Sequence, residues 1–389
     1  MRIIPSHYLS DGKGFNDGRA VELIQIEGDK DYETLLQNII RTDYYDNAYF
    51  QEHIHYQEDR VKFDAFHLTA LLRVLKPKRL LELGCGRGDV LFLLGLDKKT
   101  EVRGIEYSRD ILSKIWPDLT GKVDCGDVQE VCTSLLSDNE KYDTFCAFDF
   151  WEHLLPRRLD DYIDALVALA EKDAFFFFTI PAFGEDRVFG EIFPLEVEEN
   201  RYNFDSRLPF SYLNAESIDP IIPAQGHLVW AHSEWWQTQF ERHGLVRAED
   251  LERELHQYFD EHLFYARRSF FLFHLDRPEG RRRLKKLSTS GLSYYKKWKL
   301  FMGLQETIHS YKEGGKDPCI DINELQSTLH HAEFFMVLDV KKQIEQRIWG
   351  PTGSRRNIRW ARPFLARLEN RACQCFEIFR DKYKKRKGR

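Results

Sequence analysis

The chain has 389 residues, of which 42% are hydrophobic and 14% aromatic, so wholesale disorder is excluded and one large domain with an extension, or two domains, is expected. No run of 18 apolar residues, no apolar signal-peptide core and no Cys/His cluster at zinc spacing occurs, which predicts a cytoplasmic protein rather than a membrane-spanning, secreted or zinc-binding one. The net charge of −6 is uneven, because residues 1–275 carry −20 and residues 276–389 carry +14, which indicates an acidic globular part and a basic extension with separate roles.

The predicted elements begin at residue 61, because residues 1–60 show no clear pattern and are treated as an N-terminal segment. Apolar side chains at helical spacing predict a helix from Val61 to Leu75, which a proline at position 77 closes. A short apolar strand, Arg79–Leu83, then leads into a turn with three glycines and a helix at Asp89–Leu96. In doubly wound sheets, ligands bind at the C-terminal ends of such strands.

Strands and helices continue to alternate as far as residue 275. Further strands are predicted at 102–106, 122–125, 144–148, 174–180, 245–246 and 269–275, and further helices at 109–116 and 159–170. This alternation indicates a mostly parallel sheet with helices on both faces. The interval 181–236 breaks the rhythm, since it shows little periodicity and is rich in aromatic side chains, and we expect it to form a lid over the substrate.

The basic extension, 276–389, is predicted to be helical. Apolar residues at helical spacing within 322–347 predict a helix that packs or joins copies of the chain into a homo-oligomer. A last helix within 352–389 has one apolar and one basic face. Three roles stay open for it, namely a solvated helix, peripheral contact with the anionic inner face of a membrane, and contact with a partner protein or nucleic acid.

The glycine turn is the strongest signal, because glycines allow the backbone to approach a ligand and the next helix presents free N–H groups. Gly84 and Gly86 begin the dinucleotide fingerprint G-x-G-x-x-G, which requires a third glycine at position 89. That position is Asp89, and Gly88 instead completes G-x-G-x-G. A carboxylate there would repel a pyrophosphate but would tolerate a zwitterionic amino acid with a sulfonium. An NAD(P)-dependent oxidoreductase is therefore disfavoured and stays as the alternative.

Acidic residues stand at the ends of the successive predicted strands. Glu82 lies just ahead of the glycines and suits the same ligand. Glu106 ends the second strand, where its two oxygens can accept both ribose hydroxyls. Asp127, after the third strand, can take an adenine amino group or cap a helix. Asp149 ends the fourth strand, where it can face a transferred group or cap the next segment.

Four segments resemble the successive motifs of class I S-adenosylmethionine-dependent methyltransferases, of the branch that methylates small molecules and sugars. They are Leu81–Gly88, Gly104–Ser108, Gly126–Val128 and Asp149–Leu154. The resemblance covers residues 61–275 and implies a Rossmann-like, doubly wound α/β fold with a seven-stranded sheet. Six strands would be parallel and 269–275 would be antiparallel. S-adenosylmethionine is the implied cofactor.

The resemblance also implies a role for individual residues. The glycine turn and Glu82 would contact the methionine part, Glu106 the ribose, and Asp149 the sulfonium. The residues implied at the cofactor are Glu82, Gly84, Cys85, Gly86, Gly88, Glu106, Tyr107, Asp127, Val128, Asp149 and Phe150.

Three histidines are candidates for removing the acceptor's proton, because an imidazole has a pKa near neutrality. His153 follows the fourth-strand motif, and His227 and His232 lie in the aromatic interval. Each could also have an ordinary structural role. No metal ligand set is predicted.

The acceptor is expected to be a small molecule or a sugar, with O-methylation favoured. Nucleic-acid amino methyltransferases carry a proline pair after the fourth-strand acid, whereas Asp149 is followed by Phe-Trp-Glu. The acidic globular part is also a poor partner for a phosphate backbone. A membrane-linked glycan would account for the basic extension as well. A non-catalytic protein that binds the cofactor and acts through its basic helices is the second alternative.

Overall fold

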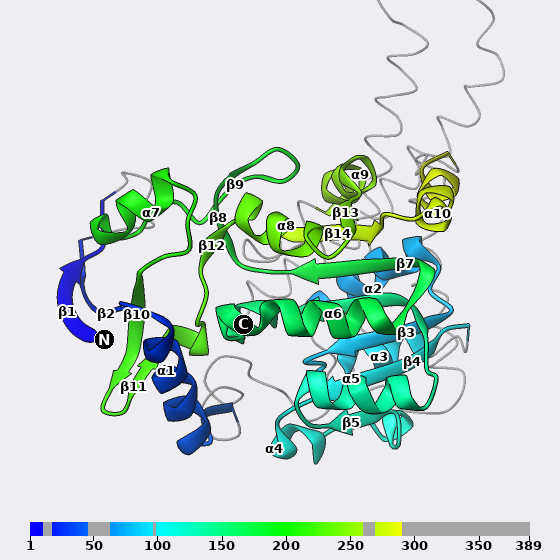
Figure 1. Ribbon diagram of the computed structural model, residues 1–389, viewed down its shortest axis with the longest axis horizontal. Helices are drawn as coiled ribbons and strands as arrows, with labels where there is room; N and C mark the ends of the chain where they lie inside the picture. The colour runs from blue at the N-terminus through cyan, green and yellow to red at the C-terminus, as the bar shows by residue number, and fades with distance from the viewer. Residues whose placement is uncertain (11–17, 46–62, 96–98, 260–268, 290–389) are drawn as a thin grey trace, which may run out of the picture. The chain divides into compact units, whose positions relative to one another are not determined.

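The computed structural model describes residues 1–10, 18–45, 63–95, 99–259 and 269–289 (Figure 1). The helices predicted within 322–347 and 352–389 lie outside the described residues. Described residues 1–45 and 64–289 group into one compact unit. None of the helices in these ranges combines the length and apolar character needed to span a bilayer.

A seven-stranded sheet forms the centre of this unit, as predicted. Its strands are β3 (Arg79–Leu83), β4 (Glu101–Glu106), β5 (Val123–Cys125), β6 (Tyr142–Phe148), β7 (Ala170–Thr179), β13 (Leu245–Arg247) and β14 (Phe270–Leu275). They lie side by side in the order β13-β14-β7-β6-β3-β4-β5. β14 runs antiparallel to both of its neighbours, and the other pairs are parallel. The strand order reverses beside β3, which places a ligand site at its C-terminal end.

The run of four phenylalanines in β7 is buried on both faces of the sheet. Phe176 and Phe178 face the neighbouring strand β14 at Phe273 and Phe271. None of these four rings is more than 1% exposed. Burying one such side chain contributes about 1.5–3 kcal/mol, so this strand pair anchors the centre of the fold.

Helices cover both faces of the sheet. Figure 1 shows α5 (Val128–Ser137) and α6 (Leu159–Leu169) in front of it, and α2 (Phe63–Leu75) and α3 (Asp89–Gly95) behind it. The remaining helices around the sheet are α4 (Arg109–Leu112), α8 (Ser233–Glu241), α9 (Glu249–Phe259) and α10 (Pro278–Thr289).

The prediction that one helix extends from Arg109 to Trp116 is wrong, because α4 ends at Leu112. Trp116 turns toward α3 instead. Its indole N–H donates to Asp89 at 2.7 Å, and its ring stacks on Phe92. The tertiary contact of the indole therefore outweighs the local helical spacing.

Two smaller sheets arise where the sequence shows no periodicity. β1 (Arg2–His7) and β2 (Ala20–Gln25) pair with β10 (Tyr212–Ile218) and β11 (Ile221–Pro223) in the antiparallel order β1-β2-β10-β11 (Figure 1). β8 (Ala182–Asp186), β9 (Gly190–Ile192) and β12 (Ala231–His232) form the other sheet. Helices α1 (Asp29–Arg41) and α7 (Arg201–Asp205) complete this region. The N-terminal segment and the 181–236 interval thus build one layer together.

His243, just after α8, connects that helix to α6. Its Nδ1 lies 2.6 Å from Oδ1 of Asp164 and its Nε2 lies 2.9 Å from Oδ1 of Asp160. Burial lowers the pKa of His243, but its hydrogen bonds to the two carboxylates outweigh this effect, and the net shift is upward. A raised folded-state pKa adds stability below the unfolded-state pKa, which is lost as the pH rises through the folded-state value.

Replacing His243 by glutamine is therefore expected to lower the free energy of unfolding by about 0.5–1 kcal/mol at pH 5.5 and by clearly less at pH 9. The effect is small because both carboxylates are largely exposed to solvent. Urea unfolding at the two pH values measures it. Equal losses at both values would contradict the role of the charged imidazole.

Candidate active site

The glycine turn between β3 and α3 has a backbone conformation in which residues with a side chain would be strained. Gly84, Gly86 and Gly88 have φ angles of 58°, 56° and 81°. A Cβ atom on Gly84 would lie 2.9 Å from Cδ2 of Phe150, and one on Gly88 would lie 2.3 Å from Cδ1 of Leu119. The turn therefore requires glycine for both its backbone path and its packing.

Glu106 lies against this turn. Its side chain accepts hydrogen bonds from the backbone N–H of Gly86 at 2.7 Å and of Ser108 at 2.9 Å. Glu106 is 7% exposed, which leaves little room for bulk water around the carboxylate. The tertiary structure thus brings together the glycine turn and the acid that were predicted to share one ligand.

Glu82 belongs to the same cluster. It lies on β3, whose neighbour is β4, and it is buried. Burial raises the pKa of the Cys85 thiol well above its usual value, and the charges of Glu82 and Glu106 raise it further. Both carboxylates therefore act on one thiol between them, and Cys85 is a neutral packing group at this edge of the sheet.

In the segment predicted to hold adenine, the carboxylate of Asp127 already accepts hydrogen bonds from the protein itself. Asp127 caps α5, where its Oδ1 accepts from the N–H of Gln129 at 2.9 Å and its Oδ2 accepts from the hydroxyl of Tyr162 at 2.5 Å. Val128 is buried in the first turn of α5, whereas Tyr107 is 56% exposed at the end of β4. The adenine contacts stay a prediction, for which Tyr107 presents an accessible ring.

Asp149 ends β6 with a strained backbone, because its φ angle is 51°. Its N–H donates to the carbonyl of Thr179 at 3.0 Å, and the hydroxyl of Thr179 donates to its Oδ1 at 2.9 Å. Phe150, the next residue, packs on Gly84. The end of β6 is thereby joined to the glycine turn on one side and to the end of β7 on the other.

The structure brings two of the three candidate histidines together. The ring centroids of His153 and His227 are 4.8 Å apart, with the rings edge to face. His232 is not part of this pair, since its Nδ1 accepts from the N–H of Glu234 at 3.1 Å and caps α8. His227 is therefore a neighbour of His153, although it lies 74 residues further along the chain and the sequence spacing does not predict the contact.

Burial lowers the pKa of His153 to about 4, although backbone hydrogen bonds to Gly226 and Asp149 oppose the shift. Its Nδ1 lies 3.2 Å from the carbonyl oxygen of Gly226 and 3.0 Å from the hydroxyl of Tyr45. The ring is thus neutral at physiological pH and held in one orientation.

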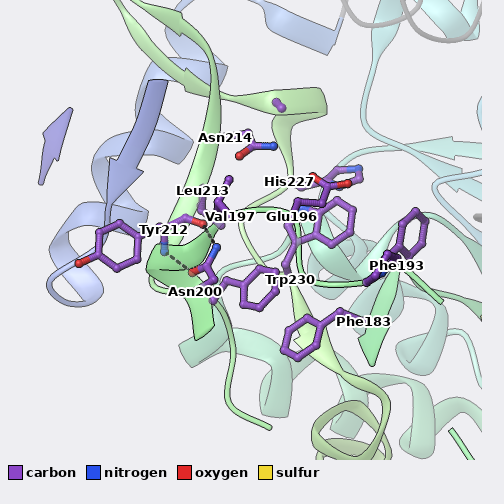
Figure 2. Close-up of a pocket in the computed structure, with 13 residues that line it drawn as sticks. Phe183, Phe193, Glu196, Val197, Asn200, Tyr212, Leu213, Asn214, His227 and Trp230 are labelled. Atoms are coloured by element: carbon purple, nitrogen blue, oxygen red, sulfur yellow. Dashed lines mark hydrogen bonds between the residues drawn. The ribbon is translucent and has the colours of Figure 1, made fainter. Parts of the chain in front are cut away.

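An aromatic pocket begins at His227 and lies in the layer built from the 181–236 interval. Its volume is about 530 Å³, including the part open to solvent. Figure 2 shows Phe193, Trp230 and Glu196 around the same hollow as His227. The lining residues are Phe183, Phe193, Pro194, Glu196, Val197, Asn200, Phe210, Tyr212, Leu213, Asn214, Ala224, His227 and Trp230.

Three polar residues of this pocket were not singled out by the sequence. The side chain of Asn200 forms two hydrogen bonds with the backbone of Tyr212. It donates to the carbonyl oxygen at 2.8 Å and accepts from the N–H at 3.1 Å (Figure 2). Burial raises the pKa of Glu196, and a hydrogen bond from Asn214 opposes this shift. The density of aromatic residues was the one signal for a pocket here, because the polar residues occur at no regular spacing.

Comparison with known proteins gives a consistent result for the fold. A family model described as a methyltransferase domain matches residues 53–258. No curated protein matches the sequence.

Similar solved structures include a SAM-dependent methyltransferase from Archaeoglobus fulgidus, with 17% identity, 55% of this chain and 92% of that one covered, and a TM-score of 0.35. The CcbJ methyltransferase from Streptomyces caelestis has 17% identity, 60% and 95% coverage, and a TM-score of 0.34. A 1,6-didemethyltoxoflavin-N1-methyltransferase from Burkholderia thailandensis, with bound 1,6-didemethyltoxoflavin and S-adenosylhomocysteine, has 13% identity, 69% and 97% coverage, and a TM-score of 0.36. At these values the three structures do not bear on the acceptor of this chain.

Proposed function

This chain belongs to the methyltransferase family whose model matches residues 53–258, with S-adenosylmethionine as its cofactor, and we propose that it methylates an oxygen of a small molecule or sugar held in the aromatic pocket. One observation carries the proposal. His227 lines the pocket and also contacts His153, which follows the C-terminal end of β6. In doubly wound sheets the strand ends hold the ligand, so the pocket would open toward the transferred methyl group.

The residues present fit the cofactor. An open glycine backbone suits the amino-acid part, and the buried carboxylate of Glu106 suits two ribose hydroxyls. The exposed ring of Tyr107 at the end of the same strand suits the flat adenine. Asp89 stands where the dinucleotide fingerprint requires its third glycine, and its buried side chain is paired with Arg87 at 2.9 Å. This arrangement disfavours the NAD(P)-dependent alternative.

The cofactor supplies an electrophilic methyl group on its positive sulfur. The new bond joins that carbon to the acceptor oxygen, and the carbon–sulfur bond breaks to leave a neutral thioether. The proton of the acceptor hydroxyl passes to an imidazole of the His153–His227 pair or to water. The protein's main contribution would be alignment, because holding the reacting atoms in line can lower the barrier by about 7–11 kcal/mol. Of the three predicted histidines, we place His227 at the acceptor oxygen, with His153 behind it and His232 outside the reaction.

The chemistry of the pocket suits a ring that carries hydroxyl groups. Phe193 and Trp230 meet edge to face with centroids 5.3 Å apart, and they offer apolar surface for a flat or sugar ring. Glu196 and Asn214 add hydrogen-bonding groups to the same pocket. A hydroxyl group of the acceptor would form a hydrogen bond with the half-buried side chain of Glu196, which an apolar acceptor would not.

Replacing Trp230 by alanine is expected to raise the acceptor KM by about 10-fold or more, because an aromatic side chain at a ligand contributes about 2 kcal/mol or more. The assay is transfer of labelled methyl from S-adenosylmethionine to a panel of hydroxylated small molecules, nucleotide-linked sugars and lipid-linked sugars. Affinity for the cofactor, measured by calorimetry, should stay within about 2-fold because the pocket lies in another layer.

Trp235→Ala is the matched control, since Trp235 lies on α8 and does not line the pocket. It should leave the acceptor KM unchanged. Cofactor binding without transfer to any acceptor would contradict the proposal and favour the non-catalytic alternative. Transfer to small molecules but to neither class of sugar would exclude the sugar acceptor.

A further inference from the structure

A carboxylate and two imidazoles converge behind the pocket. Glu152 and His153 lie on one short 3₁₀ turn, Trp151–His153, and His227 reaches them from the far end of the inserted interval. One oxygen or nitrogen atom from each side chain lies within 4.8 Å of the other two. The side chain of Glu152 is fully buried and that of His227 is 5% exposed.

The backbone holds these two segments at a set separation. The carbonyl oxygen of Glu152 accepts hydrogen bonds from the N–H groups of Leu228 at 2.7 Å and Val229 at 3.0 Å. These are the residues directly after His227, so the bonds tie its segment to the 3₁₀ turn. The cluster is thus built into the protein core and does not depend on mobile surface side chains.

The ring of His153 shows the support typical of a metal ligand. Its Nδ1 lies within hydrogen-bond distance of the Gly226 carbonyl and of the Tyr45 hydroxyl. A second partner of this kind fixes the ring orientation of most ligating histidines.

We propose that Glu152, His153 and His227 bind one divalent transition-metal ion, with Zn²⁺ or Mn²⁺ as the leading candidates. Two imidazoles and a carboxylate form a ligand set that such ions prefer, whereas sites for Ca²⁺ consist of oxygen ligands. The 3.8 Å between Nε2 of His227 and Oε1 of Glu152 suits two ligands of one ion, since it is long for a direct hydrogen bond.

The ion would act on the acceptor, and this part of the inference rests on the proposed function. Because His227 also lines the pocket, an acceptor oxygen in the pocket would come within reach of the ion. A bound divalent ion lowers the pKa of an attached hydroxyl and holds its oxygen in place. No metal ligand set was expected from the sequence, because short spacings do not bring His227 to His153, which lies 74 residues earlier.

The test measures metal directly on the full chain. The purified protein is stripped with a chelator and titrated by calorimetry with ZnCl₂ and, separately, MnCl₂, and elemental analysis gives the amount bound. We expect about one equivalent, with a Kd of about 1 µM or lower for Zn²⁺. His227→Ala and Glu152→Gln should each weaken binding by about 100-fold or more. Co²⁺ in place of Zn²⁺ should give visible absorption bands that both variants lose.

His232→Ala is the matched control, because this histidine lies in the same interval but outside the cluster, and it should bind the ions like the wild type. Binding of less than about 0.2 equivalent, or the same loss in His232→Ala as in His227→Ala, would overturn the site. Glu152→Gln keeps the size of the side chain. If its thermal unfolding midpoint equals that of the wild type, weaker metal binding reflects the lost ligand and not a lost fold.

Calorimetry with S-adenosylmethionine on the same samples separates this inference from the proposed function. Metal binding without any binding of the cofactor would overturn the methyl-transfer role and leave the site standing. Cofactor binding and transfer that both persist unchanged after the metal is removed would overturn the action of the ion on the acceptor.

Discussion

Replacing Glu106 by alanine is expected to weaken the binding of S-adenosylmethionine by about 30- to 700-fold, which corresponds to about 2–4 kcal/mol. Two contributions add to this loss. The variant removes the charged oxygens that we place at the ribose hydroxyls, and hydrogen bonds to charged groups contribute about 1.5–3 kcal/mol each. It also removes the acceptor of the Gly86 N–H, which holds the glycine turn at the end of β4.

Calorimetry with S-adenosylmethionine measures the effect, and Glu101→Ala is the matched control. Glu101 begins the same strand at its opposite end, where it is exposed and pairs with Arg79 at 3.0 Å. Its loss should change cofactor affinity by less than about 2-fold. Glu106→Gln keeps an oxygen that can accept from the turn, so we expect an intermediate loss. Unchanged affinity in Glu106→Ala would reject the ribose assignment.

The second large effect is expected for stability. Arg247→Ala should lower the free energy of unfolding by about 3–5 kcal/mol, because it leaves two buried carboxylates without their cation. The guanidinium is 1% exposed and contacts Asp186 at 2.8 and 3.0 Å and Glu252 at 2.5 Å. It thereby joins β13 of the central sheet to β8 of the inserted layer and to α9.

The loss should also depend on pH. Burial raises the pKa of Asp186, but hydrogen bonds from Arg247 outweigh this effect, and the net shift is downward. In the variant Asp186 loses the cation and keeps the hydrogen bonds from Val188 and Ser233, so its folded-state pKa rises. Burial already raises the pKa of Glu252 to about 7 with Arg247 present, so without Arg247 this pKa should lie further above its unfolded value. Such a group destabilises the fold progressively as the pH rises through the region between the two values. We therefore expect a larger loss at pH 8 than at pH 5.

Urea unfolding followed by circular dichroism at both pH values checks this prediction. Arg253→Ala serves as the control, since Arg253 lies on α9 and pairs with Asp250 at the surface. Its loss should change the free energy of unfolding by no more than about 0.5 kcal/mol. A change of less than about 1 kcal/mol for Arg247→Ala would show that water or rearrangement compensates the two buried charges.

The central sheet and the glycine turn were predictable because their signals are local. β3 and the glycine turn are contiguous, and Glu106 follows within one strand and helix. Strands buried on both faces also appear as apolar runs, as in Phe175–Phe178, so their positions could be predicted within a few residues. The seven-stranded sheet and its antiparallel strand β14 were confirmed for this reason.

The region around the aromatic pocket was not predictable in the same way. β10 pairs with β2 from the other end of the domain, and the register of its pairing with β11 shifts between Ala215 and Ser217, so no regular alternation marks it. The N-terminal strands and the 181–236 interval therefore show no recognisable strand pattern when each is considered separately. Their strands form a sheet only when they pair with one another. Asp127 also could not be assigned from the sequence. An aspartate after a strand suits both a helix cap and a ligand motif, and the structure shows that it caps α5.

By itself, the sequence determined the fold of the central sheet and predicted the edge at which we place the cofactor. These depend on glycine conformation, apolar runs and strand-end acids, which short segments encode. Only the tertiary structure decided which histidines lie together. His227 joins Glu152 and His153, and His232 does not, because backbone hydrogen bonds between distant segments set that contact. The pocket and the proposed metal site both follow from this long-range pairing, which no local pattern records.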